Sequence, residues 1–170
     1  SAQTSNPTIV SKGGSTNSIP GYWFYVSGSS LKFALSDGST RLIASSNQVS
    51  IHDNVWHHLA VTINRYGNAI FYVDGVNVGS FNVSSLSGKN IVNTTKNFTI
   101  GSYENSTESF LNGSLDEIMV FQKILTPSEI AVLVGTPPPP PDSSGNLISH
   151  WALDESTGTT AIDSSGNNYH

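Results

Sequence analysis

The sequence predicts an all-β protein. Apart from two histidines and an alanine, residues 56–63 are all β-branched, aromatic or leucine, and residues 69–73 continue in the same way. Such runs suit the half-buried surface of a sheet. The polar residues between them suit a hairpin loop, and Asp74-Gly75 then stands between two apolar runs, which is a strong signal for a two-residue hairpin. These observations predict a meander of three antiparallel strands.

Further strands and one short helix are expected around this meander. Strands are expected over residues 8–12, 21–26, 31–35, 41–44, 98–101 and 113–121. In residues 31–35, Lys32 and Ala34 alternate with three larger apolar residues, which predicts a strand with one wetter face. The helix is expected near residues 127–133, because Thr126 suits the N-cap and Glu129 completes a capping box.

The composition excludes several classes of function. Charged residues make up only 11% of the chain and apolar residues 36%, so the surface must be built from Ser, Thr, Asn and Gly. The net charge of −5 and the scattered lysines and arginines argue against a nucleic-acid partner. The absence of cysteine excludes disulfides and thiolate metal sites. No apolar run is long enough for membrane insertion.

The meander also resembles a known family. Its first motif is Trp-His-His-Leu-Ala-Val-Thr at residues 56–62, and its second is Phe-Tyr-Val-Asp-Gly-Val-Asn-Val-Gly at residues 71–79. Together they resemble the central signature of laminin-G-like (LamG-like) domains of the concanavalin A-like lectin/glucanase superfamily. The resemblance implies a two-sheet antiparallel jelly-roll β-sandwich, usually non-catalytic, in secreted and cell-surface proteins. A short helix after the last strand is a further trait of the family.

A proline-rich segment suggests how the chain is organised. Residues 1–135 are expected to form a laminin-G-like sandwich that lacks its opening strands, and residues 136–146, with five successive prolines, a stiff linker. Residues 147–170 resemble the opening strand and turn of such a module. We expect this segment to pair with a sandwich, either its own or that of a neighbouring copy of the chain.

An enzyme is the third alternative, because the superfamily contains glycoside hydrolases. A glycosidase of this kind holds two carboxylates close together. The adjacent acids of residues 116–117 and 154–155 point to opposite faces of a strand and do not suit that role. By the same alternation, His57 and His58 cannot chelate one metal ion together. The sequence therefore predicts no catalytic residues.

Calcium is the metal that the resemblance implies, because many relatives hold a structural calcium between a turn of this kind and the closing strand. The candidates here are Asp116, Asp163 and Asn167, whose oxygens are of the type that calcium prefers. The alternative is that Asp-Ser-Ser-Gly-Asn at residues 163–167 is simply good turn chemistry. The same pentapeptide recurs at residues 142–146, inside the expected linker.

The leading functional expectation is a binding or adhesion module, for a glycan or a protein ligand, of a larger extracellular or cell-surface protein with tandem modules. The candidate ligand-binding residues are Tyr66 and Tyr103, because both lie in predicted loops, where an aromatic residue has less structural reason to occur. The alternative is a purely structural repeat of a stalk or filament that assembles by strand exchange through its C-terminal segment.

Overall fold

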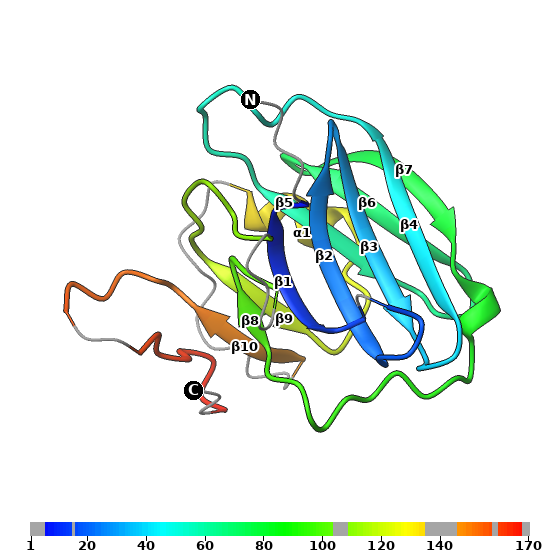
Figure 1. Cartoon of the computed structure of the whole chain (residues 1–170). Coiled ribbons are helices and arrows are strands. Elements are labelled where there is room, and N and C mark those ends of the chain that lie inside the picture. Colours follow the sequence, from blue (N-terminus) through cyan, green and yellow to red (C-terminus); the bar gives the residue numbers. More distant parts are fainter. Residues whose placement is uncertain (1–5, 15, 104–108, 135–145, 158–159, 168–170) are drawn as a thin grey trace. The chain divides into compact units, whose positions relative to one another are not determined.

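The structure is a computed structural model that describes residues 6–14, 16–103, 109–134, 146–157 and 160–167. It divides into two compact units, Ser1–Asn112 and Gly113–His170. Apart from one short α-helix and one 3₁₀-helix, the regular elements of the described residues are β-strands (Figure 1). This confirms the predicted all-β class with one short helix. The expected domain boundaries stay a prediction, and residues 136–145 of the expected linker lie outside the described residues.

The larger sheet of the first unit has five antiparallel strands in the order β4-β3-β2-β1-β8. Its strands are β1 (Thr8–Gly13), β2 (Gly21–Ser27), β3 (Ser30–Ser36), β4 (Arg41–Gln48) and β8 (Thr99–Ile100). Long β-prone runs separated by Gly and Ser turns explain the consecutive pairing from β1 to β4. Strand β8 comes from a distant part of the sequence and pairs with the outer edge of β1, with Ile100 opposite Val10.

The smaller sheet is the predicted meander, and the structure confirms it. Its strands are β5 (Leu59–Ile63), β6 (Asn68–Val73) and β7 (Val76–Asn82), in the order β5-β6-β7. The turn between β6 and β7 has positive φ at both central residues, 50° at Asp74 and 77° at Gly75. This is the backbone that the right-handed twist of a tight hairpin requires, and Asp-Gly adopts it readily.

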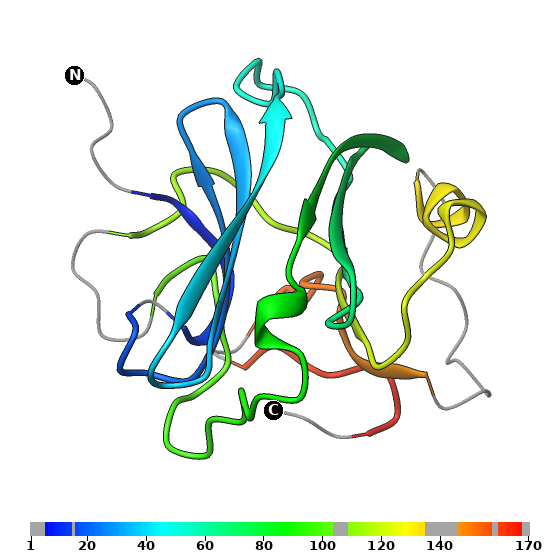
Figure 2. The same cartoon turned by 90° about the vertical axis from the view of Figure 1, so that its right-hand side faces the viewer.

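The two sheets form two layers of the first unit, as the two views in Figures 1 and 2 show. Both contribute large buried side chains to the core, including Phe24, Leu31 and Phe33 from the larger sheet and Phe71 from the smaller one. Strand β7 also approaches β4 closely: a Cβ on Gly79 would lie 2.9 Å from the backbone nitrogen of Asn47. A side chain at this position would therefore push the two strands apart.

The second face of β2 and β3 is largely covered: Ala34 is fully buried and Lys32 is half-buried, so the wetter face predicted over residues 31–35 is found only at Lys32. The rings of Trp23 and Tyr25 stack with centroids 3.9 Å apart, and the ring of Tyr103 packs against Trp23 at 5.4 Å. Ala34 lies in this cluster and is fully buried. The expected alternation fails at Ala34, because a side chain as small as that of alanine is easily covered by the rings of its neighbours.

The second unit contains β9 (Ile118–Phe121), α1 (Pro127–Leu133) and β10 (Leu147–Trp151). Strand β10 pairs antiparallel with β9, with Trp151 opposite Ile118 and His150 opposite Met119. Trp151 also forms an isolated bridge with Asp163. The segment that resembles an opening strand thus pairs with β9, which lies within the strand expected over residues 113–121. Whether it completes a sandwich stays a prediction.

Helix α1 begins with the predicted capping box. Oγ1 of Thr126 accepts the N–H of Glu129 at 3.3 Å, and the Glu129 carboxylate accepts the N–H of Thr126 at 2.8 Å. The ammonium group of Lys123, 2.5 Å away, and the donors of Thr126 lower the pKa of Glu129 to about 2. Ile130 anchors the helix as its buried residue. Within the described ranges, no helix has the length and apolar character needed to cross a bilayer.

Many loops are shaped by the same local hydrogen bond. A side-chain oxygen of Asp or Asn accepts the backbone N–H two residues later, which forms an Asx turn. This bond occurs at Asp37, Asp53, Asn64, Asn77, Asn82, Asn90, Asn93 and Asp163. The high content of Asn therefore has a structural use in this fold.

Candidate functional site

One end of the smaller sheet carries an exposed tryptophan. Trp56 is 66% exposed, whereas Trp23 and Trp151 are buried, with exposed fractions of only 7% and 8%. Val55 and Val76 are also largely exposed. We call Val55, Trp56 and Val76 the Trp56 surface. All three residues lie at the same end of the smaller sheet, and exposed apolar residues on one face indicate a contact surface more often than isolated ones do.

The backbone is hydrogen-bonded on both sides of Trp56. After it, the N–H of Asp74 donates to the carbonyl of His58 at 2.8 Å, and Oδ1 of Asp74 accepts the N–H of His58 at 2.9 Å. Before it, Oδ1 of Asp53 accepts the N–H of Val55 at 3.0 Å. The segment that leads into β5 is therefore attached to the turn between β6 and β7.

The ring of His57 adds side-chain contacts to this backbone attachment. Its Nδ1 lies 2.8 Å from Oδ2 of Asp74, and its Nε2 lies 3.1 Å from Oδ1 of Asp53. The side chain of His57 is 16% exposed, against 41% for Asp53 and 46% for Asp74. Carboxylate oxygens only accept hydrogen bonds, and a neutral imidazole carries one N–H. Both contacts are therefore hydrogen bonds only when the ring is protonated. We call these three side chains the His57 clamp.

The charges of the clamp support one another. The hydrogen bonds to Asp74 and then to Asp53 raise the pKa of His57 above the ordinary histidine value. The pKa of Asp53 is lowered by the N–H of Val55 and by His57. Burial acts to raise the pKa of Asp74, but its hydrogen bonds to His57 and to the N–H of His58 lower it on balance. When the ring is protonated, the clamp is an imidazolium ion between two carboxylates.

The neighbouring His58 is in different surroundings. Its side chain is half-buried, which lowers its pKa, and its Nδ1 is buried without a hydrogen-bond partner in the structure. The pKa values of His57 and His58 are therefore shifted in opposite directions, and the two rings have different surroundings. Among the described residues, no group of three or more His, Asp or Glu side chains is arranged to hold a metal ion.

The two tyrosines predicted to bind a ligand lie in different environments. Tyr66 is 80% exposed in the loop between β5 and β6, where its N–H donates to Oδ1 of Asn64 at 3.0 Å. This loop and the Trp56 surface lie at opposite ends of the smaller sheet, because β5 starts at one and ends at the other. Tyr103 is half-buried against Trp23, and this packing gives it a structural reason to occur in its loop.

The predicted calcium ligands are distributed over the second unit. Asp116 is exposed and accepts the N–H of Glu117. Asp163 is buried, and its carboxylate accepts the N–H of His150 at 2.9 Å and the N–H and hydroxyl of Ser165. Asn167 is in the same turn, but its side-chain nitrogen donates to two carbonyls of β10. A calcium ion would have to use the remaining lone pairs of Asp163, so calcium binding stays a prediction.

The same unit holds a polar network that the sequence did not reveal. The buried ring of His150 contacts Oε2 of Glu117 at 2.5 Å and Oγ of Ser164 at 2.7 Å. Both the N–H and the hydroxyl of Ser164 also reach the carbonyl of His150. The order Ser-His-Glu is that of a nucleophile, a base and an acid. Here the serine is bonded back to the histidine's own backbone, so we interpret the network as the fastening of the 163–165 turn to β10.

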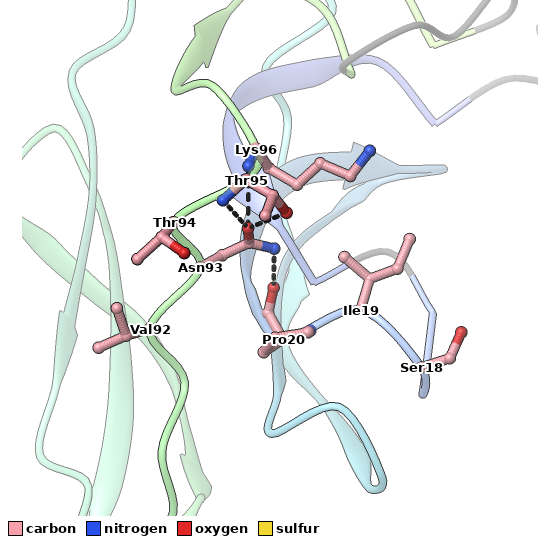
Figure 3. A pocket seen from close by; sticks show the side chains of 8 residues that line it. All are labelled: Ser18, Ile19, Pro20, Val92, Asn93, Thr94, Thr95 and Lys96. Carbon is pink, nitrogen blue, oxygen red and sulfur yellow. Dashed lines mark hydrogen bonds between the residues drawn. The ribbon is translucent and has the colours of Figure 1, made fainter.

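A shallow pocket of about 240 Å³ lies where the loop at residues 92–96 meets the connection between β1 and β2 (Figure 3). Asn93 is buried at its base. Its Nδ2 donates to the carbonyl of Pro20 at 2.8 Å, and its Oδ1 accepts the N–H groups of Thr95 and Lys96 at 3.0 and 2.9 Å. Asn93 thus joins two loops. The pocket is smaller than most small-molecule sites, which measure roughly 300–1,000 Å³.

Comparisons with known proteins found a family and a similar structure. A sequence profile of the Laminin_G_3 family, described as the concanavalin A-like lectin/glucanases superfamily, matches residues 1–131. A search of curated protein sequences gave no match. The chain is similar to the crystal structure of an S-layer domain-containing protein (residues 221–444) from Clostridium thermocellum ATCC 27405, at 22% identity and a TM-score of 0.36. The similarity covers 79% of this chain and 64% of that chain, which is less than two thirds of its length.

Proposed function

Because the chain belongs to the concanavalin A-like lectin/glucanases superfamily, we propose that it is a non-catalytic recognition module of a larger secreted or cell-surface protein. In this proposal the ligand is a neutral glycan, which the module contacts through the Trp56 surface. The observation that carries the proposal is the 66% exposure of Trp56 on a backbone that is hydrogen-bonded on both sides.

An exposed aromatic ring on a hydrogen-bonded backbone suits a sugar. The face of the indole carries the negative part of its quadrupole and is apolar, so it favours contact with the C–H groups on one face of a pyranose. If a ligand covers this ring, the apolar surface removed from water contributes roughly 25 cal/mol per Å² to the free energy of binding. A backbone that is ordered before binding also loses little conformational entropy when the ligand arrives.

Polar groups at the same end of the sheet suit the hydroxyl groups of a sugar. The carboxylates of Asp53 and Asp74 are both more than two-fifths exposed, and each oxygen accepts at most two protein donors. A carboxylate has about four acceptor positions, so lone pairs remain for a ligand. Ligand sites commonly combine an apolar surface with a few fixed polar groups in this way.

The charge of the chain favours a neutral ligand. The net charge is −5, with seven lysines and arginines in total. The two carboxylates beside the Trp56 surface add negative potential at this end of the sheet. Sulfated or uronate-rich glycans would therefore be repelled, whereas neutral hexose chains would not.

A glycan array with the wild-type chain and two matched variants tests the proposal. Trp56→Ala should abolish binding to neutral glycans, whereas Tyr66→Ala, which removes an exposed aromatic ring at the opposite end of the same sheet, should leave binding unchanged. Far-UV circular dichroism of both variants checks that the fold is kept. Because both side chains are exposed, we expect each variant to melt within a few degrees of the wild type.

Other outcomes identify the alternatives. Binding that is lost only in Tyr66→Ala would move the site to the β5–β6 loop. If the wild-type chain binds no glycan but binds a protein through Trp56, the ligand is a protein and not a glycan. A chain that binds neither would leave the structural repeat, which assembles with neighbouring modules or copies of itself, as the better account.

A further inference from the structure

We propose that a proton on His57 controls the order of the segment that carries Trp56, so that the Trp56 surface is fixed at lower pH and loosened at higher pH. The effect on ligand affinity rests on the function proposed above. The effect on the segment itself does not, because it follows from the His57 clamp alone.

The argument starts from the number of N–H groups. Both ring nitrogens of His57 face oxygens that only accept, at 2.8 Å from Asp74 and 3.1 Å from Asp53. When the ring loses its proton, one nitrogen keeps an N–H and the other presents a lone pair to a carboxylate. One hydrogen bond is then replaced by a repulsive contact.

The bond to Asp53 is the one that should break. Asp74 is held in place by its backbone bonds to His58 and by its position in the tight turn of the meander. Asp53 has as its other partner the N–H of Val55, within its own loop. Its contact with His57 is also the longer of the two. Loss of the proton therefore releases the stretch before Trp56, while His57 stays on Asp74.

Charged groups face His57 from two sides. Asp53 faces it from its own segment and Asp74 from the β6–β7 turn. His58 lies beside Asp74, and its burial favours the neutral form. The two carboxylates raise the pKa of His57. The clamp is therefore complete below the ordinary histidine value of about 6.5 and is lost as the pH rises through the raised value.

Nuclear magnetic resonance of the intact chain tests the proposal directly. The ring protons of His57 should titrate with a midpoint above about 6.5. The amide of Val55 and the indole N–H of Trp56 should shift with the same midpoint. His57→Gln should abolish the transition, and Asp53→Asn should lower its midpoint, because Asp53 raises the pKa of His57. His52→Gln, which removes a ring that contacts the carbonyl of Gly28 instead of a carboxylate, should leave it unchanged.

Acrylamide quenching of tryptophan fluorescence is an independent measurement. Trp23 and Trp151 are buried, so the quencher reports mainly on Trp56. Between pH 6 and pH 9 the quenching constant should change in the wild type and in His52→Gln, but not in His57→Gln. A titration midpoint of His57 at or below 6.5, or a Trp56 signal that ignores the titration, would overturn the proposal.

Glycan affinity separates this inference from the proposed function. If a neutral glycan binds through Trp56, its affinity should fall by about threefold to tenfold from pH 6 to pH 9, because the surface must then be ordered on binding. Equal affinity at both pH values would overturn the inference and leave the function standing. Coupled shifts of His57 and Trp56 in a chain that binds no glycan would uphold the proton control of the segment and refute the function.

Discussion

Replacing Asn93 with alanine should destabilise the first unit far more than an ordinary loop substitution. The buried side chain makes one bond to the carbonyl of Pro20, two to Thr95 and one to the N–H of Lys96. A typical hydrogen bond contributes about 1 kcal/mol net, and a partner left buried and unsatisfied costs about 1–3 kcal/mol. Thr95 is exposed and its groups can turn to water. Pro20 and Lys96 are less exposed, so the expected loss is about 2–3 kcal/mol.

Asn90→Ala is the matched control. Asn90 has the same residue type in the same loop and forms the same Asx turn, with its Oδ1 accepting the N–H of Val92 at 2.9 Å. It is exposed and joins no second segment. Its replacement should change the free energy of unfolding by about 0.5 kcal/mol or less. The contrast isolates the buried connection from the local turn.

Urea denaturation followed by far-UV circular dichroism measures both free energies. The variant Asn93→Asp adds a third comparison, because it keeps the acceptor of the Asx turn but puts an oxygen in place of the nitrogen that donates to Pro20. It should therefore be at least as destabilising at neutral pH as the loss of that one bond. If Asn93→Ala and Asn90→Ala differ by less than about 0.5 kcal/mol, the loop is not held by Asn93 and the reasoning is refuted.

Four further predictions follow from the packing and capping described above. Tyr103→Ala should lower the free energy of unfolding by about 1–3 kcal/mol, because its ring packs against the buried cluster; an unchanged urea midpoint would contradict this. Thr126→Ala should cost about 1 kcal/mol through loss of the cap, whereas Thr126→Ser should cost little, as thermal melts would show. A chelator should lower the melting temperature by a few degrees if calcium binds near Asp163. Identical melts with and without chelator, in calcium-free buffer, would refute calcium binding. Deleting residues 147–170 removes β10 and should change the stability or the gel-filtration size, and no change in either would show that the segment pairs with nothing.

The parts of the fold that could be predicted depend on residues a few positions apart. Asp74-Gly75 determines its hairpin and Thr126 with Glu129 starts its helix, because in both cases the partners are local in the sequence. The five-stranded order was not predictable in the same way. The pairing of β8 with β1 joins segments that are far apart in the chain, and no local signal marks it.

The candidate site lay largely beyond sequence reasoning for the same reason. Trp56 stands in a β-prone run and is predicted to be part of a strand, but β5 begins only at Leu59. The strand starts late because Asp74, which comes from another element, bonds both His57 and the backbone of His58. The sequence does show Asp74 in the turn and Asp53 before the tryptophan. Only the structure shows that both carboxylates contact the ring of His57.

The Asx turns have a consequence for where such a module can work. In the turns at Asn64, Asn77 and Asn90 the acceptor is a neutral amide, and each bond spans only two residues, a distance far shorter than the roughly 8–10 Å over which dissolved ions screen charges at ordinary ionic strength. With 11% charged residues, the surface also offers few ion pairs that salt could weaken. The loops of this chain should therefore hold the same shapes in fresh water and in brine. Acidity would then act on the molecule where salt does not, at the His57 imidazole between Asp53 and Asp74.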